Sequence, residues 1–393
     1  MKSNLKYIIT SACFLIFIFG FTIAGYLSED KAFSETENRT LQQIPEFSWT
    51  SLKSGVYTSK LDTYMSDQIF LKDQLVSIKV RADRMLLKNY QNDIYFGDDN
   101  YFIQDYKESK ALIDTNINAI NNFCDKIKGE ADISFMLVPN AISVLSDKLP
   151  AVTQCDNQLE SIEYVKDKLS ENINLYCPYD ELKSASDNGT QVFFRTDHHW
   201  TPEGARVGFD GLMAQMGESV PDIDYTIETL NDFYGTLYSK APYSGAKSDS
   251  INLYSNKDNE ITVTYANGAN DPSLITEGET VGNDIVTHSI FDDYYKTQKD
   301  KYATFLGGNF ALVNIESTVG KDENVLILKD SYANSTIPYF VNTFKHITLI
   351  DMRYYHMQAL EVSEYVKENN IDKVIFLYNM DFINSDNNFV WLG

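Results

Sequence analysis

Three short apolar runs near the C-terminus constrain the fold more than any other feature of the chain. They cover residues 325–328, 346–350 and 373–377, and a segment of helical character follows each of the first two. Two more runs, at 133–138 and 191–196, also have the length of buried strands. Short apolar strands that alternate with helices are typical of a parallel sheet covered on both faces. We therefore predict an α/β fold with a mostly parallel sheet flanked by helices.

The N-terminus carries an almost unbroken apolar run over residues 7–26, preceded by Lys2 and Lys6. About 20 apolar residues are enough to span a bilayer as a helix, and the basic flank of such a helix stays in the cytoplasm. We predict one transmembrane helix within residues 1–27, which holds the rest of the chain on the extracytoplasmic side of the cell membrane. A cleaved signal peptide is the alternative, but the length of the apolar run favours retention.

The rest of the chain divides by composition. Residues 28–55 are polar and predict a stalk, and residues 56–393 predict the globular domain. Within that domain, apolar residues recur at helical spacing over 56–90, which predicts an amphipathic helix, and a tight turn at 97–100 predicts a hairpin. Regular alternation is lost at about 218–300, where polar, Gly- and Asn-rich segments surround one strand-like stretch at 260–265, so we predict an insertion there.

Charge and cysteine content exclude some classes of partner. The chain has 33 basic and 56 acidic side chains and a net charge of -23. Such a surface repels nucleic acid, so a nucleic-acid partner is not expected. The four cysteines fit no metal-ligand spacing and leave the disulfide state open.

The segment 195–201, Arg-Thr-Asp-His-His-Trp-Thr, is the densest group of chemically active side chains. It lies between a predicted strand and a predicted helix, where ligand sites form in sheets of this kind. Asp197 and His199 are two residues apart, so the carboxylate can orient the imidazole as a general base. The alternatives are a metal site made of Asp197, His198 and His199, or a structural cap on the next helix.

A nucleophile for such a base is found at Ser331, immediately after the apolar run 325–328. The start of the following helix predicts that the hydroxyl emerges at the carboxyl edge of the sheet, where the helix N-terminus favours developing negative charge. A serine in this position is also a common N-cap, which is the structural alternative.

These motifs together resemble the DHHW family. The resemblance rests on Thr-Asp-His-His-Trp-Thr, on the later Lys-Asp-Ser-Tyr-Ala-Asn, on Asp-Met-Arg-Tyr-Tyr at 351–355 and on Phe-Leu-Gly-Gly-Asn at 305–309. That family is similar to the SGNH-hydrolase-like proteins that O-acetylate bacterial exopolysaccharides such as alginate. Two features depart from the usual SGNH pattern: Lys329 stands where glycine precedes Asp-Ser, and the Gly-x-Asn-Asp block is absent.

The resemblance implies a catalytic group of Ser331, His199 and Asp197 in an SGNH-like domain. The ends of the next two predicted strands are the positions where the family would have groups that stabilise the oxyanion or bind substrate. They correspond here to Arg353, Tyr378 and Asn379. For Arg353, a salt bridge at a strand end is the structural alternative.

The function expected from this resemblance is transfer of an acetyl group, through an acyl-serine, to a hydroxyl of a cell-surface or exported polysaccharide. It requires no metal and no cofactor. The implied partners are the polysaccharide acceptor and a membrane-bound O-acyltransferase that supplies acyl groups. An acetyl esterase on the same glycans, a non-catalytic glycan-binding or scaffold module, and a metal-dependent hydrolase are the alternatives.

Overall fold

The computed structural model describes residues 2–34, 39–266, 278–355 and 360–392. Within it the chain forms two compact units: Met1–Lys88 with Ser239–Ala246, and Asn89–Tyr238 with Lys247–Gly393.

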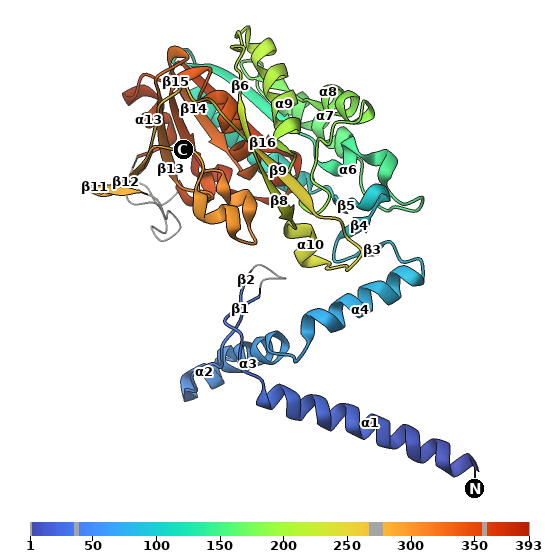
Figure 1. Ribbon diagram of the computed structural model, residues 1–393. Coiled ribbons are helices and arrows are strands. Elements are labelled where there is room, and N and C mark those ends of the chain that lie inside the picture. Colours follow the sequence, from blue (N-terminus) through green and yellow to red (C-terminus); the bar gives the residue numbers. More distant parts are fainter. Residues whose placement is uncertain (1, 35–38, 267–277, 356–359, 393) are drawn as a thin grey trace. The chain divides into compact units, whose positions relative to one another are not determined.

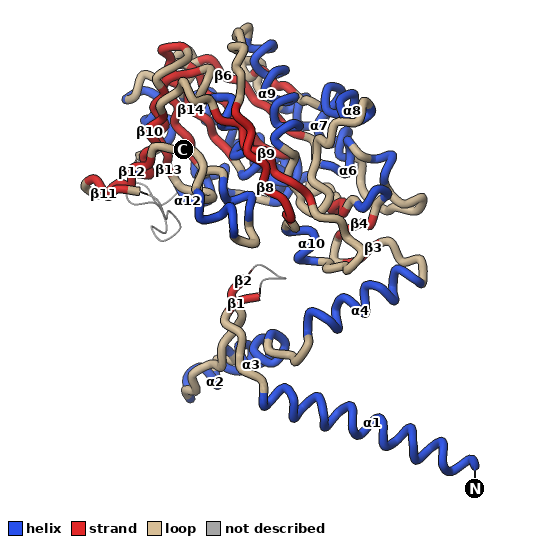
Figure 2. Tube along the Cα trace, viewed as in Figure 1, coloured by secondary structure: helices blue, strands red, loops and turns tan. Residues whose placement is uncertain are grey.

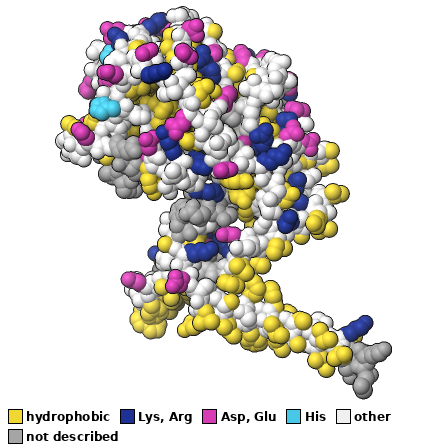
Figure 3. Space-filling model, in the orientation of Figure 1, with side chains coloured by type: hydrophobic (Ala, Val, Ile, Leu, Met, Phe, Trp, Pro, Cys, Tyr) yellow, Lys and Arg dark blue, Asp and Glu magenta, His cyan; other side chains and the backbone are white. Residues whose placement is uncertain are grey.

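The first unit begins with a long apolar helix, α1 (Lys2–Leu27). Its segment Leu5–Leu27 has 23 residues and a mean hydropathy of 2.3, and none of it is buried. Hydrophobic side chains cover this helix in the space-filling view (Figure 3). By length and composition α1 can cross a membrane, in agreement with the predicted N-terminal anchor.

The amphipathic helix predicted over residues 56–90 is two helices. They break at Leu71, whose left-handed backbone (φ 55°) does not continue a right-handed helix. The elements of this unit that follow α1 are β1 (Phe33–Ser34), β2 (Arg39–Thr40), α2 (Trp49–Lys53), α3 (Val56–Asp67) and α4 (Lys72–Met85).

The second unit is built on a nine-stranded sheet (Figure 1). Its strands, in spatial order, are β11 (Glu279–Val281), β12 (Asp284–Thr287), β10 (Ile261–Tyr265), β13 (Leu312–Ser317), β15 (Phe344–Ile350), β14 (Lys321–Lys329), β16 (Lys373–Asn379), β6 (Asp132–Val138) and β7 (Asn174–Tyr176). The predicted runs near the C-terminus and at 133–138 therefore are strands. β6, β14 and β16 are buried on both faces over most of their length, as their continuous apolar sequence predicts.

The sheet is mixed, so the prediction of a mostly parallel sheet needs correction. β15, β14, β16, β6 and β7 pair in parallel. β11, β12, β10 and β13 pair antiparallel, and β13 joins β15 antiparallel as well. Burial alternates along β13, which is typical of antiparallel strands with one face less covered. Much of this antiparallel half comes from the segment predicted as an insertion, of which residues 267–277 lie outside the described residues.

Two smaller sheets complete the described strands of the second unit, and in the first unit β1 pairs antiparallel with β2. The predicted hairpin at 97–100 is present: β4 (Ile94–Phe96) and β5 (Phe102–Gln104) pair antiparallel, with β3 (Tyr90–Gln91) beside them. β8 (Thr226–Phe233) and β9 (Asp249–Ser255) form a separate antiparallel pair.

Helices flank the large sheet (Figure 2), and α6, α7, α8 and α9 form one group beside it. The α-helices that follow α4 are α5 (Lys110–Lys126), α6 (Ala141–Val144), α7 (Gln158–Lys168), α8 (Tyr179–Asp187), α9 (Pro202–Met216), α10 (Thr236–Lys240), α11 (Ile337–Phe340), α12 (Met352–Tyr355), α13 (Val362–Glu368) and α14 (Met380–Ser385). The 3₁₀ turns are η1 (Asp98–Asn100), η2 (Ser146–Lys148), η5 (Asp293–Thr297), η6 (Lys301–Thr304), η7 (Ser331–Thr336) and η8 (Asn388–Leu392).

The strand predicted over residues 191–196 is not formed. The segment makes one isolated bridge, between Phe193 and Trp200, and folds back on itself as a loop. The Phe194 N–H donates to the His199 carbonyl oxygen at 3.2 Å. Val192, Phe193 and Phe194 are buried. The apolar run therefore reflects burial, which periodicity alone does not distinguish from strand structure.

Truncation of the central strand is expected to be costly. Ile327 lies in β14 and is fully buried, so Ile327→Ala leaves a cavity and should lower the free energy of unfolding by about 2–5 kcal/mol. Ile227→Ala, at an exposed position of β8, is the matched control and should change it by less than about 0.5 kcal/mol. Urea denaturation of both variants measures the difference, and equal losses would contradict this account of the core.

Candidate active site

Polar side chains follow three neighbouring parallel strands of the large sheet. Asp330 and Ser331 come directly after β14, Asn379 ends β16, and Asn140 follows β6. Because β6, β16 and β14 are adjacent and parallel, these residues meet at one edge. The Asn140 Nδ2 donates to the Asn379 Oδ1 at 3.0 Å, and the Asn379 Nδ2 donates to the Asp330 Oδ2 at 2.7 Å. The strand ends are thus cross-linked by their own side chains.

The loop that carries Asp197 and His199 is held by the first residue of β9. One carboxylate oxygen of Asp249 accepts from the Arg195 N–H at 3.1 Å. The other accepts from the Thr196 N–H at 2.9 Å and from its hydroxyl at 2.8 Å. Beyond the loop, Thr201 caps α9 by accepting from the Gly204 N–H at 3.1 Å. These bonds give the loop one defined shape.

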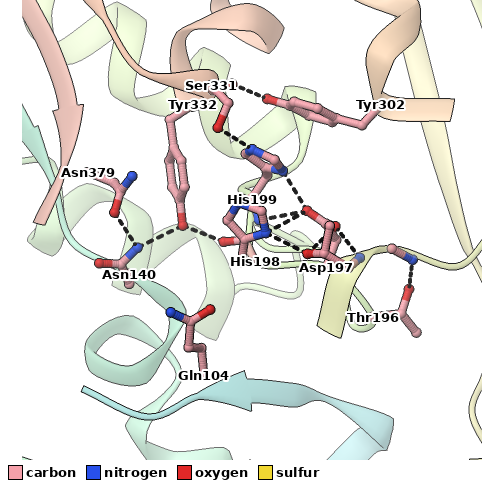
Figure 4. A network of polar contacts seen from close by, with 12 residues as sticks. Gln104, Asn140, Thr196, Asp197, His198, His199, Tyr302, Ser331, Tyr332 and Asn379 are labelled. Carbon is pink, nitrogen blue, oxygen red and sulfur yellow. Dashed lines mark hydrogen bonds and ion pairs between the residues drawn. The ribbon is translucent and has the colours of Figure 1, made fainter. Parts of the chain in front are cut away.

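His199 lies between a carboxylate and a hydroxyl (Figure 4). Its Nδ1 is 2.5 Å from the Asp197 Oδ1, and its Nε2 is 2.8 Å from the Ser331 Oγ. Asp197 and His199 are buried, whereas Ser331 is partly exposed. The structure therefore brings together the three residues predicted as the catalytic group, although 132 residues separate His199 from Ser331.

Asp197 is surrounded by donors. Its Oδ2 accepts from the Thr236 N–H at 2.7 Å and from the Thr236 hydroxyl at 3.0 Å, while its Oδ1 also accepts from the His199 N–H at 3.0 Å. Burial opposes ionisation of this carboxyl, but the adjacent His198 and His199 and these hydrogen bonds outweigh burial and hold the pKa of Asp197 well below its usual range. The carboxylate is therefore charged and can orient the imidazole.

Gly235 allows Thr236 to approach Asp197 this closely. A Cβ atom at position 235 would lie 2.2 Å from the Asp197 Oδ2 and 2.3 Å from its Cβ. Any larger residue would displace the carboxylate, so the close approach requires glycine.

Tyr302, from η6, packs on the face of His199. The two rings are stacked, with centroids 3.9 Å apart and planes 9° apart. The Tyr302 hydroxyl donates to the Ser331 carbonyl oxygen at 2.9 Å. Burial raises the pKa of Tyr302 above its usual value, so the hydroxyl keeps its proton. One side chain thereby fixes the plane of the imidazole and the backbone of the serine.

Ser331 opens onto a cavity of about 140 Å³. Among its other lining residues are Gln104, Tyr106, Asn140, Gln158, His198, Arg353, Asn379, Asp381, Phe382 and Ser385. The apolar part of the lining comes from Ala141, Ile142, Leu237 and Phe382, so polar and apolar surfaces share the cavity. Gln104, Asn140, His198 and Asn379 are drawn with Asp197, His199 and Ser331 in Figure 4.

Of the predicted oxyanion or substrate-binding residues, two reach this cavity. Arg353 lines it and also forms a bidentate pair with Asp351, at 2.9 Å through Nε and 2.5 Å through Nη2. Asn379 lines it as well. Tyr378 does not: it is fully buried and packs against Phe382 and Phe389. Successive residues of β16 face opposite sides, so the structure brings Asn379 to the site and turns Tyr378 away.

Lys329, which replaces the glycine of the usual Gly-Asp-Ser pattern, is buried behind the site. Its ammonium donates to the Asn309 Oδ1 at 3.0 Å and to the Asn334 Oδ1 at 2.7 Å. Burial lowers the pKa of Lys329 to about 8. It ties the 305–309 segment to η7 and does not line the cavity.

Asp197, His198 and His199 also present metal-ligand atoms within 4.8 Å of one another. Both ring nitrogens of His199 are engaged, by Asp197 and Ser331, and the His198 Nδ1 is 2.7 Å from the Thr236 Oγ1. A metal bound by all three would have to displace several of these hydrogen bonds.

Four residues of the site are not predicted by the sequence patterns: Tyr302, Thr236, Asp249 and Asn140. Asn140 had a usable signal, because it follows Val138 and Pro139 at the end of a predicted strand. Tyr302 lies in η6, Thr236 begins α10 and Asp249 begins β9. No motif in the sequence connects these three residues to His199.

Comparisons with known proteins agree with this architecture. A DHHW family protein from Eubacterium siraeum has 24% identity and a TM-score of 0.64, covering 76% of this chain and 94% of that structure. Bacillus cereus PatB1 with a sulfonyl adduct has 24% identity and a TM-score of 0.61, covering 77% and 100%. At this identity the likeness concerns the fold.

Among curated proteins, the chain is similar to the probable alginate O-acetylase AlgJ of Pseudomonas fluorescens, with 20% identity over 176 residues. The match covers 43% of this chain and 44% of that relative's length. The family model for DHHW proteins matches residues 87–350, which is more than half of the chain. The protein therefore belongs to the DHHW family.

Proposed function

We propose that this protein is an SGNH-type serine O-acetyltransferase that moves an acetyl group, through an acyl-serine at Ser331, to a hydroxyl of a polysaccharide outside the cytoplasm. The observation that carries the proposal is the unbroken chain from Asp197 through His199 to Ser331, at 2.5 and 2.8 Å. The curated relative's name, an alginate O-acetylase, supports both acetyl transfer and a polysaccharide acceptor.

In the first half-reaction, the Ser331 Oγ attacks the carbonyl carbon of an acetyl donor while its proton passes to the His199 Nε2. Asp197 stabilises the resulting imidazolium. The tetrahedral intermediate collapses, the bond to the leaving group breaks, and His199 returns the proton to that group. The product is an acetyl ester on Ser331.

In the second half-reaction, an acceptor hydroxyl replaces the leaving group. His199 takes the proton of that hydroxyl as its oxygen attacks the acetyl ester, and then returns it to the Ser331 Oγ. The acetyl group leaves on the acceptor, and the free enzyme is regenerated without metal or cofactor.

The oxyanion of both intermediates needs donors at the cavity. We propose the backbone N–H of Ser331 together with Asn379 or Arg353, since both side chains line the cavity. Each such donor contributes roughly 3 kcal/mol to the transition state. Arg353 already donates to Asp351 through Nε and Nη2. Only the N–H groups that do not point at this carboxylate can donate to the oxyanion.

The location follows from the proposed topology. We propose that residues 1–27 are retained as an anchor, that 28–55 act as a stalk and that 56–393 lie on the extracytoplasmic side, because Lys2 and Lys6 favour the cytoplasm. A membrane-bound O-acyltransferase is the proposed acyl donor.

An acetyl esterase is the second candidate, since water in place of the acceptor gives the same chemistry. The discriminating experiment supplies the purified chain with an activated acetyl ester, with and without a neutral oligosaccharide. Acetylated sugar supports the transferase, whereas acetate release that the sugar leaves unchanged supports the esterase. Absence of an acyl-serine, acetate and acetylated sugar would favour a glycan-binding module.

Tyr302 provides a graded test of the mechanism. Tyr302→Leu removes the ring that stacks on His199, and loss of a buried cation–π contact with the imidazolium, worth about 1–2 kcal/mol, should slow acylation about tenfold. Tyr302→Phe keeps the ring and loses only the hydroxyl, so it should be less impaired. Stopped-flow acylation rates give the comparison, and equal rates for Tyr302→Leu and the unchanged protein would contradict a role for the stack.

A further inference from the structure

The helix α4 in the first unit carries an exposed apolar stripe. The stripe consists of Leu71, Leu75, Ile78, Met85 and Leu86, which are between 37% and 83% exposed. Their spacing of three to four residues puts them on one face of a helix. Ala82, at the gap in the stripe, is exposed too.

The opposite face of α4 carries a buried side chain. Val80, about half a turn away from Ile78, is fully buried. The stripe therefore lies on the exposed face of the helix. An exposed apolar face of this kind marks a binding surface.

The charges around the stripe identify the partner. Residues 71–88 hold five basic and two acidic side chains, a net charge of +3 in a chain whose total is -23. Lys79 and Arg81 flank the stripe on either side, are exposed, and form no ion pair within the described residues. A helix with an apolar face bordered by basic residues suits the surface of an anionic bilayer, where long basic side chains reach the headgroups.

The helix α4 is also close in sequence to the candidate transmembrane helix α1. Residues 28–71 alone separate α4 from α1, the helix long and apolar enough to cross a membrane, and both belong to the same compact unit. We propose that α4 lies in the surface of the bilayer that α1 spans, with the apolar stripe at the acyl-chain boundary and Lys79 and Arg81 among anionic headgroups. This binding site is independent of the proposed acetyl transfer.

The test uses the full chain in vesicles of phosphatidylglycerol and phosphatidylcholine brominated on their acyl chains, because bromine quenches tryptophan only at close range. Ile78→Trp reports on the stripe, and Val152→Trp, at another exposed apolar position, is the matched control. The unchanged chain gives the background from Trp49, Trp200 and Trp391.

We expect the added emission of Ile78→Trp to lose most of its intensity and shift to shorter wavelength, and that of Val152→Trp to keep both. Lys79→Glu with Arg81→Glu, in the Ile78→Trp background, should weaken quenching in phosphatidylglycerol vesicles, with circular dichroism confirming that the helix content is unchanged. Unquenched emission at position 78, or equal quenching at both positions, would overturn the proposal and point to a protein partner for the stripe. Quenching that the charge reversal leaves unaltered would overturn the role of the headgroups.

Discussion

Ser331→Ala is expected to abolish the acetyl adduct that forms when the protein meets an activated acetyl ester, and to lower turnover at least about 10³-fold. The alanine removes the oxygen that lies 2.8 Å from the His199 Nε2, and within the described residues no other hydroxyl bonds to that nitrogen. Intact-mass spectrometry after brief exposure measures the adduct, and peptide mapping locates it.

Ser335→Ala is the matched control for this experiment. Ser335 also lies in η7, but it is fully buried and accepts from the Tyr302 hydroxyl at 3.2 Å instead of contacting His199, so its loss should leave the adduct at Ser331 in place. An adduct that persists in Ser331→Ala and maps elsewhere would remove the main support for the acyl-serine. If neither the unchanged protein nor the control is modified, the result favours the non-catalytic glycan-binding module.

Asp197→Asn should lower turnover about 10⁴-fold while leaving the fold intact. The amide is nearly isosteric, but it has no charge to stabilise the imidazolium. Its NH₂ group would also face the His199 Nδ1 or the two donors of Thr236. Because the pKa of Asp197 is held low, the carboxylate stays ionised through the mildly acidic range, so its protonation does not limit activity there.

Asp210→Asn is the control for loss of one negative charge. Asp210 lies on α9 and pairs with Arg206 at the surface, so turnover should change little. Steady-state rates with an activated acetyl ester compare the two variants. An Asp197→Asn protein that keeps near-normal turnover would contradict the proposed general base.

Local patterns in the sequence predicted the central strands of the fold and the residues that meet at the candidate site. The continuous apolar runs of β14 and β16 predicted buried parallel strands, and the residues that follow them predicted where Ser331 and Asn379 lie. The strand-like stretch predicted at 260–265 is β10. The other antiparallel strands were missed, because short strands such as β11 and β12 leave only a weak pattern among polar residues.

Contacts between segments that are distant in the sequence could not be predicted from such local patterns. Tyr302 reaches His199 from a 3₁₀ turn about 100 residues away in sequence, and Asp249 holds the 195–201 loop from a separate sheet. Tyr378 was predicted to lie at the site from its position near the end of its strand. Neighbouring residues of a strand face opposite sides of the sheet, and the sequence does not show whether Tyr378 or Asn379 faces the cavity.

The pair of strands β8 and β9 has a consequence for how the protein loses activity. Thr236 lies in the connection between these strands and Asp249 begins the second, so both supports of the Asp197 loop belong to one peripheral hairpin. Small peripheral units of this kind open more readily than a buried sheet. Transient opening of the hairpin would release the Asp197 carboxylate while the nine-stranded sheet stays folded. The protection of β9 amides from hydrogen exchange should therefore follow the active fraction of molecules more closely than the global melting transition does.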